Sequence, residues 1–151
     1  TEHVAEPLEE HCVIYVIGQR ADHEFVTSEP VCYKSLAEVD ALLLSSTIVA
    51  RRVDGVGLVT LSTFTLGRHF DGFNGTGSSI SIVGSSCTGG YWNTSTAWDN
   101  RISSSYNGCA HLRHFSSPNK SGSSEDTYGS GQTDNLGPLN NDTESVAYYS
   151  S

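Results

Sequence analysis

Short stretches with strand character are separated by polar turns along most of this chain, and helical spacing occurs in one place. The stretch Cys12–Ile17 is rich in β-branched residues and predicts a strand. A second extended piece is expected over 24–33, where Pro30 favours an edge or a turn. The residues Ser-Leu-Ala-Glu at 35–38 match a capping box. Leucines and a valine then follow at helical spacing, which predicts a helix over 36–45.

The remainder of the chain shows no helical spacing. Short segments with strand character are separated by turns rich in Gly, Ser and Asn, a pattern that predicts a small antiparallel sandwich. These segments are 56–66, 79–83, 108–115 and 146–149. We therefore expect a mainly β protein with two parts. A small disulfide-bonded β-β-α module occupies residues 1–52, and the sandwich occupies residues 53–151.

The boundary between these parts carries the pair Arg51-Arg52. Two interpretations stand side by side. The pair is either a dibasic processing site that separates a propeptide-like segment from the mature domain, or two exposed arginines in a linker.

The four cysteines are divided between the two parts of the chain. Their even number and separation favour two local disulfides, Cys12 with Cys32 and Cys87 with Cys109, although four cysteines allow three connectivities. No two cysteines have the short spacing of a zinc knuckle or a redox motif, which argues against thiolate–metal chemistry. Disulfides favour an oxidising compartment.

The acidic net charge of the chain argues against one class of partner, nucleic acids. The formal net charge is −9, from 17 acidic and 8 basic residues, and this argues against nucleic-acid binding, which needs a cationic face. No apolar run is long enough to span a membrane, so no membrane partner is expected.

A chain that begins at Thr1 fits a processed secretory protein. We expect secretion, with glycosylation sequons at Asn74, Asn93, Asn119 and Asn141.

Two aromatic-rich segments carry a family resemblance. The segment 68–79 has aromatics at Phe70 and Phe73 and serines at its end, and 114–124 is a more degenerate copy. They resemble the folded hairpin of the βγ-crystallin family, and the likeness covers roughly residues 64–150. The resemblance implies a sandwich of two Greek keys.

A second resemblance lies in two Asx-rich segments. Residues 99–104 read Asp-Asn-Arg-Ile-Ser-Ser and match the family's calcium motif, Asx-Asx-x-x-Ser/Thr-Ser, at every specified position. Residues 140–145 read Asn-Asn-Asp-Thr-Glu-Ser and depart from the motif only at the fifth position, Glu144. Calcium takes about six to eight oxygen ligands, which such segments concentrate. The alternative is that both segments only form Asx- and Ser-capped turns.

The resemblance implies two calcium sites that are each shared between the two segments. One segment supplies Asx oxygens, and the other supplies the backbone carbonyl of its third residue and the side chain of its fifth. The implied ligands are Asp99, Asn100, Arg101, Ser103, Asn140, Asn141, Asp142 and Glu144. The carboxylate of Glu144 either coordinates more strongly than a hydroxyl or is too long for the site.

The sequence contains no nucleophile elbow and no paired catalytic carboxylates, so we expect a non-enzymatic protein. The expected function is secreted calcium binding that stabilises the fold. One alternative is a proteinase inhibitor, because a bacterial metalloproteinase inhibitor shares the fold, with 116–127 as its exposed loop. The other is an extracellular structural or adhesive subunit that assembles through strand edges. The corresponding partners are calcium, a secreted protease, a glycan bound by the aromatic residues, or copies of the chain itself.

The segment 32–38 also resembles the leading part of secreted microbial proteins in which a crystallin-like domain follows. This likeness implies no function.

Overall fold

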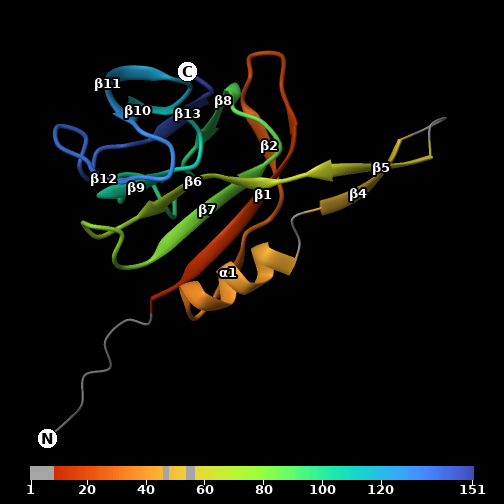
Figure 1. The fold of residues 1–151 in the computed structure, drawn as a ribbon. Helices are drawn as coiled ribbons and strands as arrows, with labels where there is room; N and C mark the ends of the chain where they lie inside the picture. The colour runs from red at the N-terminus through yellow and green to blue at the C-terminus, as the bar shows by residue number, and fades with distance from the viewer. Residues whose placement is uncertain (1–8, 46–47, 54–56) are drawn as a thin grey trace, which may run out of the picture.

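The computed structural model describes residues 9–45, 48–53 and 57–151. Among these residues strands predominate and form two large sheets and one small one, so the mainly β architecture is confirmed. Figure 1 shows the two large sheets stacked, with the single helix below them. That helix has 10 residues, and no helix in the described ranges is long and apolar enough to cross a membrane.

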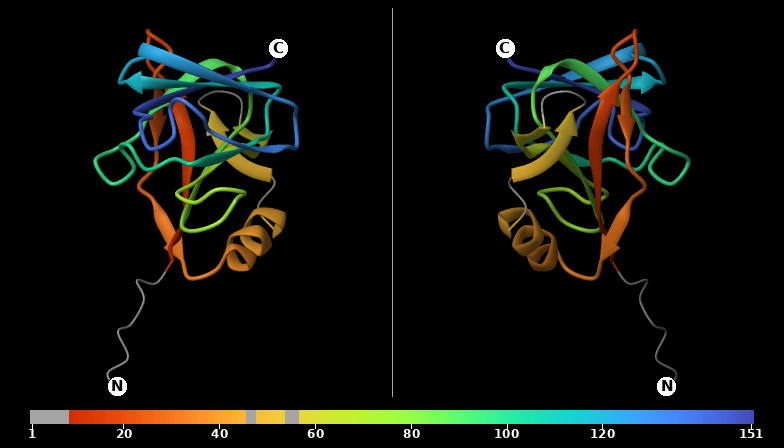
Figure 2. Two further views of the ribbon diagram at one scale, coloured as in Figure 1. Left: turned by 90° about the vertical axis from the view of Figure 1, so that its left-hand side faces the viewer. Right: turned by 90° about the vertical axis from the view of Figure 1, so that its right-hand side faces the viewer.

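The N-terminal elements agree closely with the sequence pattern. They are β1 (His11–Gln19), β2 (Phe25–Thr27), β3 (Val31–Tyr33) and α1 (Leu36–Ser45). The Ser35 hydroxyl accepts a hydrogen bond from the Glu38 backbone N–H at 3.2 Å, as expected of a residue that caps a helix start. The helix packs its buried Val39 against Val13 and Val83, on the side of the first sheet that faces away from the second (Figure 2).

The first sheet joins the N-terminal segment to the rest of the chain. Its strands follow the order β12-β9-β6-β7-β1-β2, and β3 pairs with β1. The elements not yet given are β6 (Phe64–Phe70), β7 (Ser79–Gly84), β9 (Ser104–Asn107) and β12 (Thr133–Asn135). Strand β1 runs parallel to β7 from the pair His11 and Ser79 to the pair Tyr15 and Val83. The N-terminal segment thus extends this sheet by backbone hydrogen bonds.

The second sheet has the order β11-β10-β13-β8 and is antiparallel throughout. Its strands are β8 (Thr88–Asn93), β10 (His111–Ser117), β11 (Ser121–Tyr128) and β13 (Ser145–Tyr149). Strands β6 to β9 and β10 to β13 are two consecutive sets of four. In each set the third strand, β8 or β12, lies in the sheet of the other set.

A shared core lies between the two sheets. Leu66, Ile80 and Ile82 from the first sheet cluster with buried residues of the second. These partners are Trp92, Leu112, Val146 and Tyr148. Ile14 and Phe25 belong to the same cluster, so the N-terminal segment contributes to the core as well as to the sheet.

Both expected disulfides form. Cys12–Cys32 joins the neighbouring strands β1 and β3, and Cys87–Cys109 joins the start of β8 to the turn before β10. No free cysteine is present in the chain. The favoured connectivity among the three is therefore confirmed.

One expectation about the surface is corrected, and another is confirmed with one exception. Most of 116–127, expected as an exposed loop, belongs to β10 and β11, which pair from His111 with Tyr128 to Ser117 with Ser121. The aromatic residues are mostly buried as expected, but the Tyr128 side chain is 61% exposed because it ends the edge strand β11.

The remaining elements are β4 (Ile48–Val53) and β5 (Gly57–Ser62). They form an antiparallel hairpin that is a sheet of its own. In Figure 1 it extends sideways from the stacked sheets. The boundary expected after residue 52 falls inside this hairpin.

Candidate metal centre

The two Asx-rich segments occupy matching places in the fold. Loop 1 (99–104) ends where β9 begins, and loop 2 (140–145) ends where β13 begins. Their second residues, Asn100 and Asn141, have φ angles of 60° and 57°. Asn tolerates this left-handed conformation better than most residues do, because its short side chain can hydrogen-bond locally. An Asx residue at the second position therefore suits the sharp turn in each loop.

The backbones of the two loops are joined reciprocally. The N–H of Asn100 donates to the carbonyl of Thr143, and the N–H of Asn141 donates to the carbonyl of Ile102, both at 3.0 Å. In each case the second residue of one loop bonds to the fourth residue of the other. The loops are therefore held face to face by an approximately two-fold arrangement.

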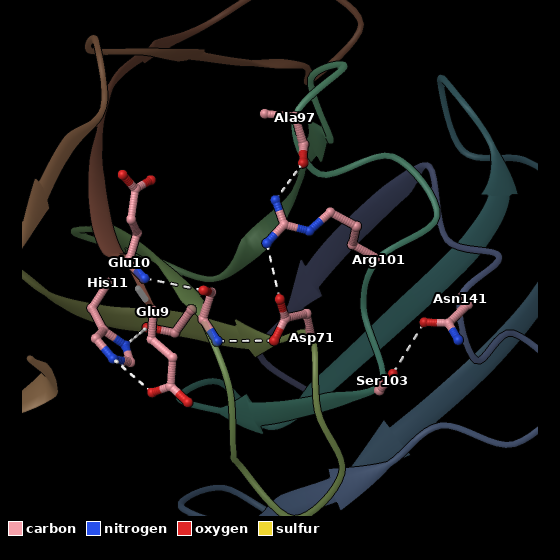
Figure 3. Close-up of polar contacts among 10 residues, drawn as sticks. Glu9, Glu10, His11, Asp71, Ala97, Arg101, Ser103 and Asn141 are labelled. Carbon is pink, nitrogen blue, oxygen red and sulfur yellow. Dashed lines mark hydrogen bonds and ion pairs between the residues drawn. The ribbon is translucent and has the colours of Figure 1, made fainter. Parts of the chain in front are cut away.

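The side chains repeat this arrangement. The Ser103 hydroxyl donates to Oδ1 of Asn141 at 3.1 Å, as Figure 3 shows. The amide of Asn100 donates to Oε1 of Glu144 at 3.3 Å. Each contact joins the fifth residue of one loop to the second residue of the other. The structure thus brings together two clusters of oxygen atoms, and each cluster draws on both loops.

The first residues of the two loops, Asp99 and Asn140, differ in the hydrogen bonds of their side chains. Thr94 donates a short hydrogen bond to Oδ1 of Asp99, so this carboxylate is held by its own half of the molecule. The backbone N–H of Thr94 donates to the carbonyl of Glu144, the fifth residue of loop 2. In the same way, the N–H of Leu136 donates to the carbonyl of Ser103, the fifth residue of loop 1, so Leu136 is the counterpart of Thr94 in the other half of the molecule. Leucine has no hydroxyl, and the buried Oδ1 of Asn140 has no hydrogen-bond partner among the described residues.

The third residues present backbone oxygens. The carbonyls of Arg101 and Asp142 accept no hydrogen bond from any described residue. Carbonyl oxygen is a ligand type that calcium takes readily. All eight residues expected from the motif therefore lie in the two facing loops.

Each loop is also attached to the hairpin of its own half. The backbone N–H groups of Ser103 and Glu144 donate to the carbonyls of Phe70 and Phe115, both at 2.8 Å. The sixth residues continue the attachment, since the Ser104 hydroxyl donates to the carbonyl of Gly72 at 2.6 Å. The Ser145 hydroxyl donates to the carbonyl of Ser117 at 2.7 Å. The final serine of the motif thus has a structural role.

Sequence reasoning missed an ion pair beside loop 1. The Arg101 guanidinium donates to Oδ2 of Asp71 at 2.9 Å and to the carbonyl of Ala97 at 2.7 Å (Figure 3). It also lies 4.4 Å from the centre of the Trp98 ring. Asp71 in turn accepts the N–H of Ser78 at 2.8 Å. The Arg101 side chain therefore ties loop 1 to the 71–78 hairpin while its carbonyl stays free.

In the sequence, Asp71 stands out only as an acidic residue directly after Phe70. No pattern near Asp71 or near Arg101 indicates that the two residues form a pair. The pair borders a cavity of about 410 Å³. This cavity is lined by Glu9, Glu10, Cys12, Asp71, Gly77, Ser78, Trp98 and Arg101.

A second anchor missed from sequence supports loop 2. The Glu125 carboxylate accepts hydrogen bonds from the backbone N–H groups of Gly137, at 2.8 Å, and Leu139, at 3.0 Å. These residues directly precede Asn140. A carboxylate that accepts backbone N–H groups makes charge-assisted bonds, which are stronger than neutral ones. Glu125 therefore fixes the approach to loop 2.

The four sequon asparagines all take part in contacts between distant segments. Asn93 and Asn119 bond to each other, with Nδ2 of Asn93 also donating to Glu24 at 2.8 Å. Asn74 pairs with Asn135, and Asn141 accepts from Ser103. These asparagines thus have structural roles, and Asn93 uses both hydrogens of its Nδ2, the atom to which a glycan would be attached.

One further group of potential metal ligands occurs in the described ranges. Glu10, Cys12 and Cys32 bring three ligand atoms within 4.8 Å of one another. The two sulfur atoms are joined in a disulfide and cannot act as thiolates, so this group does not compete with the facing loops.

A comparison with protein-family models found no match to this chain. A comparison with curated proteins found no significant match either.

Proposed function

We propose that this chain is a secreted, non-enzymatic, calcium-binding protein of the βγ-crystallin type, in which calcium bound between loops 1 and 2 stabilises the fold. The observation that carries the proposal is the reciprocal contact between the loops. Ser103 meets Asn141 and Glu144 meets Asn100, so each cluster holds oxygen ligands from two distant segments. An ion held in this way cross-links the two halves of the sandwich.

Strand order supports the family assignment. Two consecutive sets of four strands exchange their third strands between the sheets, as expected for two interlocked Greek keys. The Asx motif closes each set directly before its last strand. The repeated motif and the repeated topology therefore have the same order along the chain.

Ligand chemistry favours calcium over a transition metal. The facing loops offer carboxylate, amide, hydroxyl and backbone carbonyl oxygens, and they contain no histidine or cysteine. Two disulfides are typical of proteins that fold in an oxidising compartment, which supports the proposed secretion.

The proposal is tested by thermal unfolding and calorimetric titration of the whole chain with calcium, magnesium and a chelator. An ion that binds only the native state at one hundred times its dissociation constant stabilises it by about 2.7 kcal/mol. For a domain of this size that corresponds to an increase in Tm of about 5–10 °C. We expect calcium to raise Tm, a chelator to reverse the increase, and magnesium to have a smaller effect.

A pair of serine variants connects this response to the loops. Ser103→Ala removes one hydroxyl ligand, whereas Ser123→Ala removes an exposed hydroxyl on β11 and serves as the control. We expect Ser103→Ala to weaken calcium binding and Ser123→Ala to leave it unchanged. Absence of binding heat and of any change in Tm at millimolar calcium would refute the proposal.

A further inference from the structure

The hairpin formed by β4 and β5 carries the only adjacent pair of basic residues in the sequence, Arg51-Arg52. The two strands pair with each other from Ile48 and Ser62 to Val53 and Gly57. Among the described residues, neither strand pairs with a strand of the two large sheets. One edge of β4 is thus unpaired, and Figure 1 shows the hairpin standing away from the stacked sheets.

An unpaired strand edge is a template on which another protein can add a strand. An endoprotease that holds its substrate as an extended chain can therefore bind β4 with little rearrangement. An isolated two-stranded hairpin is only marginally stable, so local opening around the bond to be cut also costs little. Both routes expose the backbone that follows the two arginines.

Three arginines of the sandwich are less suited to cleavage than Arg51 and Arg52, whereas Arg20 and Lys34 are exposed and are the competing sites for a basic-specific protease. Arg68 lies inside the first sheet, where its side chain is 13% exposed and paired with Asp40. Arg113 lies on β10, which has a strand on each side. Arg101 is held by Asp71 and Trp98. Cleavage at these positions requires that the sandwich opens, whereas cleavage in β4 does not.

The segments on either side of β4 are attached to the molecule independently. Before it, β1 pairs with β7 at five positions and Ile14 and Phe25 are buried in the shared core. After it, β6 pairs with both β7 and β9. Neither disulfide crosses the hairpin, because one lies wholly before it and the other wholly after it.

We infer that β4 is a processing site for an arginine-specific serine endoprotease, and that the cut protein persists as two associated chains. In the reaction, water adds across the Arg52–Val53 peptide bond, leaving a carboxylate on Arg52 and an amino group on Val53. The fragment before the cut stays bound through the β1–β7 pairing and the core. It therefore acts as a permanent part of the fold and is not released as a propeptide.

Limited digestion of the native chain tests this inference directly. We expect trypsin at a low enzyme ratio, and an endoprotease specific for dibasic sites, to make a first cut after Arg51 or Arg52. Mass spectrometry identifies the two fragments. They should co-elute as one species in size-exclusion chromatography under native conditions. They should separate in guanidinium chloride without any reductant, because no disulfide joins them.

Two variants make the test specific. The double substitution Arg51→Gln with Arg52→Gln should resist the first cut and keep the thermal unfolding of the parent. The control Arg20→Gln removes an arginine whose side chain is 65% exposed and should be cut like the parent. Resistance of the native parent chain, a first cut outside β4, or release of the N-terminal fragment in native buffer would each overturn the inference. None of these outcomes depends on calcium, so the calcium proposal stands or falls separately.

Discussion

Glu144 accepts a hydrogen bond from Asn100 across the two Asx-rich loops, with 3.3 Å between Oε1 and Nδ2. The matching contact in the other half of the molecule joins Ser103 to Asn141. A carboxylate thus occupies one of two related positions and a hydroxyl occupies the other. This difference makes the two proposed calcium sites chemically unequal.

We predict that Glu144→Gln weakens one calcium-binding event about tenfold, or about 1.4 kcal/mol, and leaves the other unchanged. The amide keeps the size and the acceptor oxygen of the side chain but removes the negative charge that attracts the cation. Calorimetric titration measures both events. Glu29→Gln, in the exposed turn between β2 and β3, is the charge-matched control. Identical titration curves for the two variants would show that Glu144 is not a ligand.

Glu125 provides a test of how loop 2 is held. Its carboxylate accepts N–H groups of Gly137 and Leu139, and hydrogen bonds to charged groups contribute about 1.5–3 kcal/mol each when buried. The side chain is half-buried, so we expect Glu125→Gln to lower the free energy of unfolding by about 1–2 kcal/mol. Urea unfolding in the presence of a chelator measures this loss without any contribution from bound ion. A midpoint equal to that of Glu29→Gln would contradict the prediction.

Because two of its histidines are buried, we predict that the free energy of unfolding of the protein falls in mild acid. His69 and His114 are fully buried, and the Ser105 hydroxyl lies 2.7 Å from Nδ1 of His69 and 2.9 Å from Nε2 of His114. Burial lowers the pKa of His69 well below its usual value, and the neighbouring His114 lowers it further. Burial also lowers the pKa of His114 to about 4.

The unfolded chain therefore takes up protons on these histidines at a higher pH than the folded chain does. Stability is complete above the unfolded pKa of about 6.5 and falls as the pH drops from there towards 4. His114 alone accounts for about 3 kcal/mol of this loss. Urea unfolding between pH 7 and 4.5 measures the slope, and His114→Gln should flatten it. A slope that is unchanged in this variant would show that other groups cause it.

The disulfide between Cys87 and Cys109 joins the start of one strand in the second sheet to the turn that begins another. It closes a segment with a sequence separation of 22, for which the chain-entropy model gives about 3 kcal/mol of stabilisation. We predict that the double substitution Cys87→Ala with Cys109→Ala lowers the free energy of unfolding by about this amount. Urea unfolding at neutral pH provides the measurement. An unchanged midpoint would contradict the prediction.

Local signals in the sequence were sufficient for the N-terminal elements. The β-branched stretch Cys12–Ile17 lies within β1, and the helix expected over 36–45 has those bounds. Both depend on local effects. The strand follows from the stiffness of β-branched side chains, and the start of the helix follows from the Ser35 cap. Elements of this kind can be predicted from a short window of sequence.

Several strands of the sandwich could not be predicted in this way. Strand β11 reads Ser-Gly-Ser-Ser-Glu-Asp-Thr-Tyr, and β8 begins Thr-Gly-Gly, so neither has the composition of a strand. The short strands β9 and β12 are equally polar. They are extended because a neighbouring strand offers a full set of backbone partners, and such pairing overrides weak intrinsic preference.

The sequence by itself determined which residues were candidates for the site: the Asx, Ser and Glu side chains of two similar segments. Only the tertiary structure decided that these segments face each other, that Arg101 reaches Asp71, and that β1 joins β7 in parallel. These relationships require strands distant in sequence to share a sheet or exchange between sheets. The sheet hydrogen bonds that bring these segments together join backbone groups that are the same in every residue, so no local pattern of side chains specifies which strands will meet.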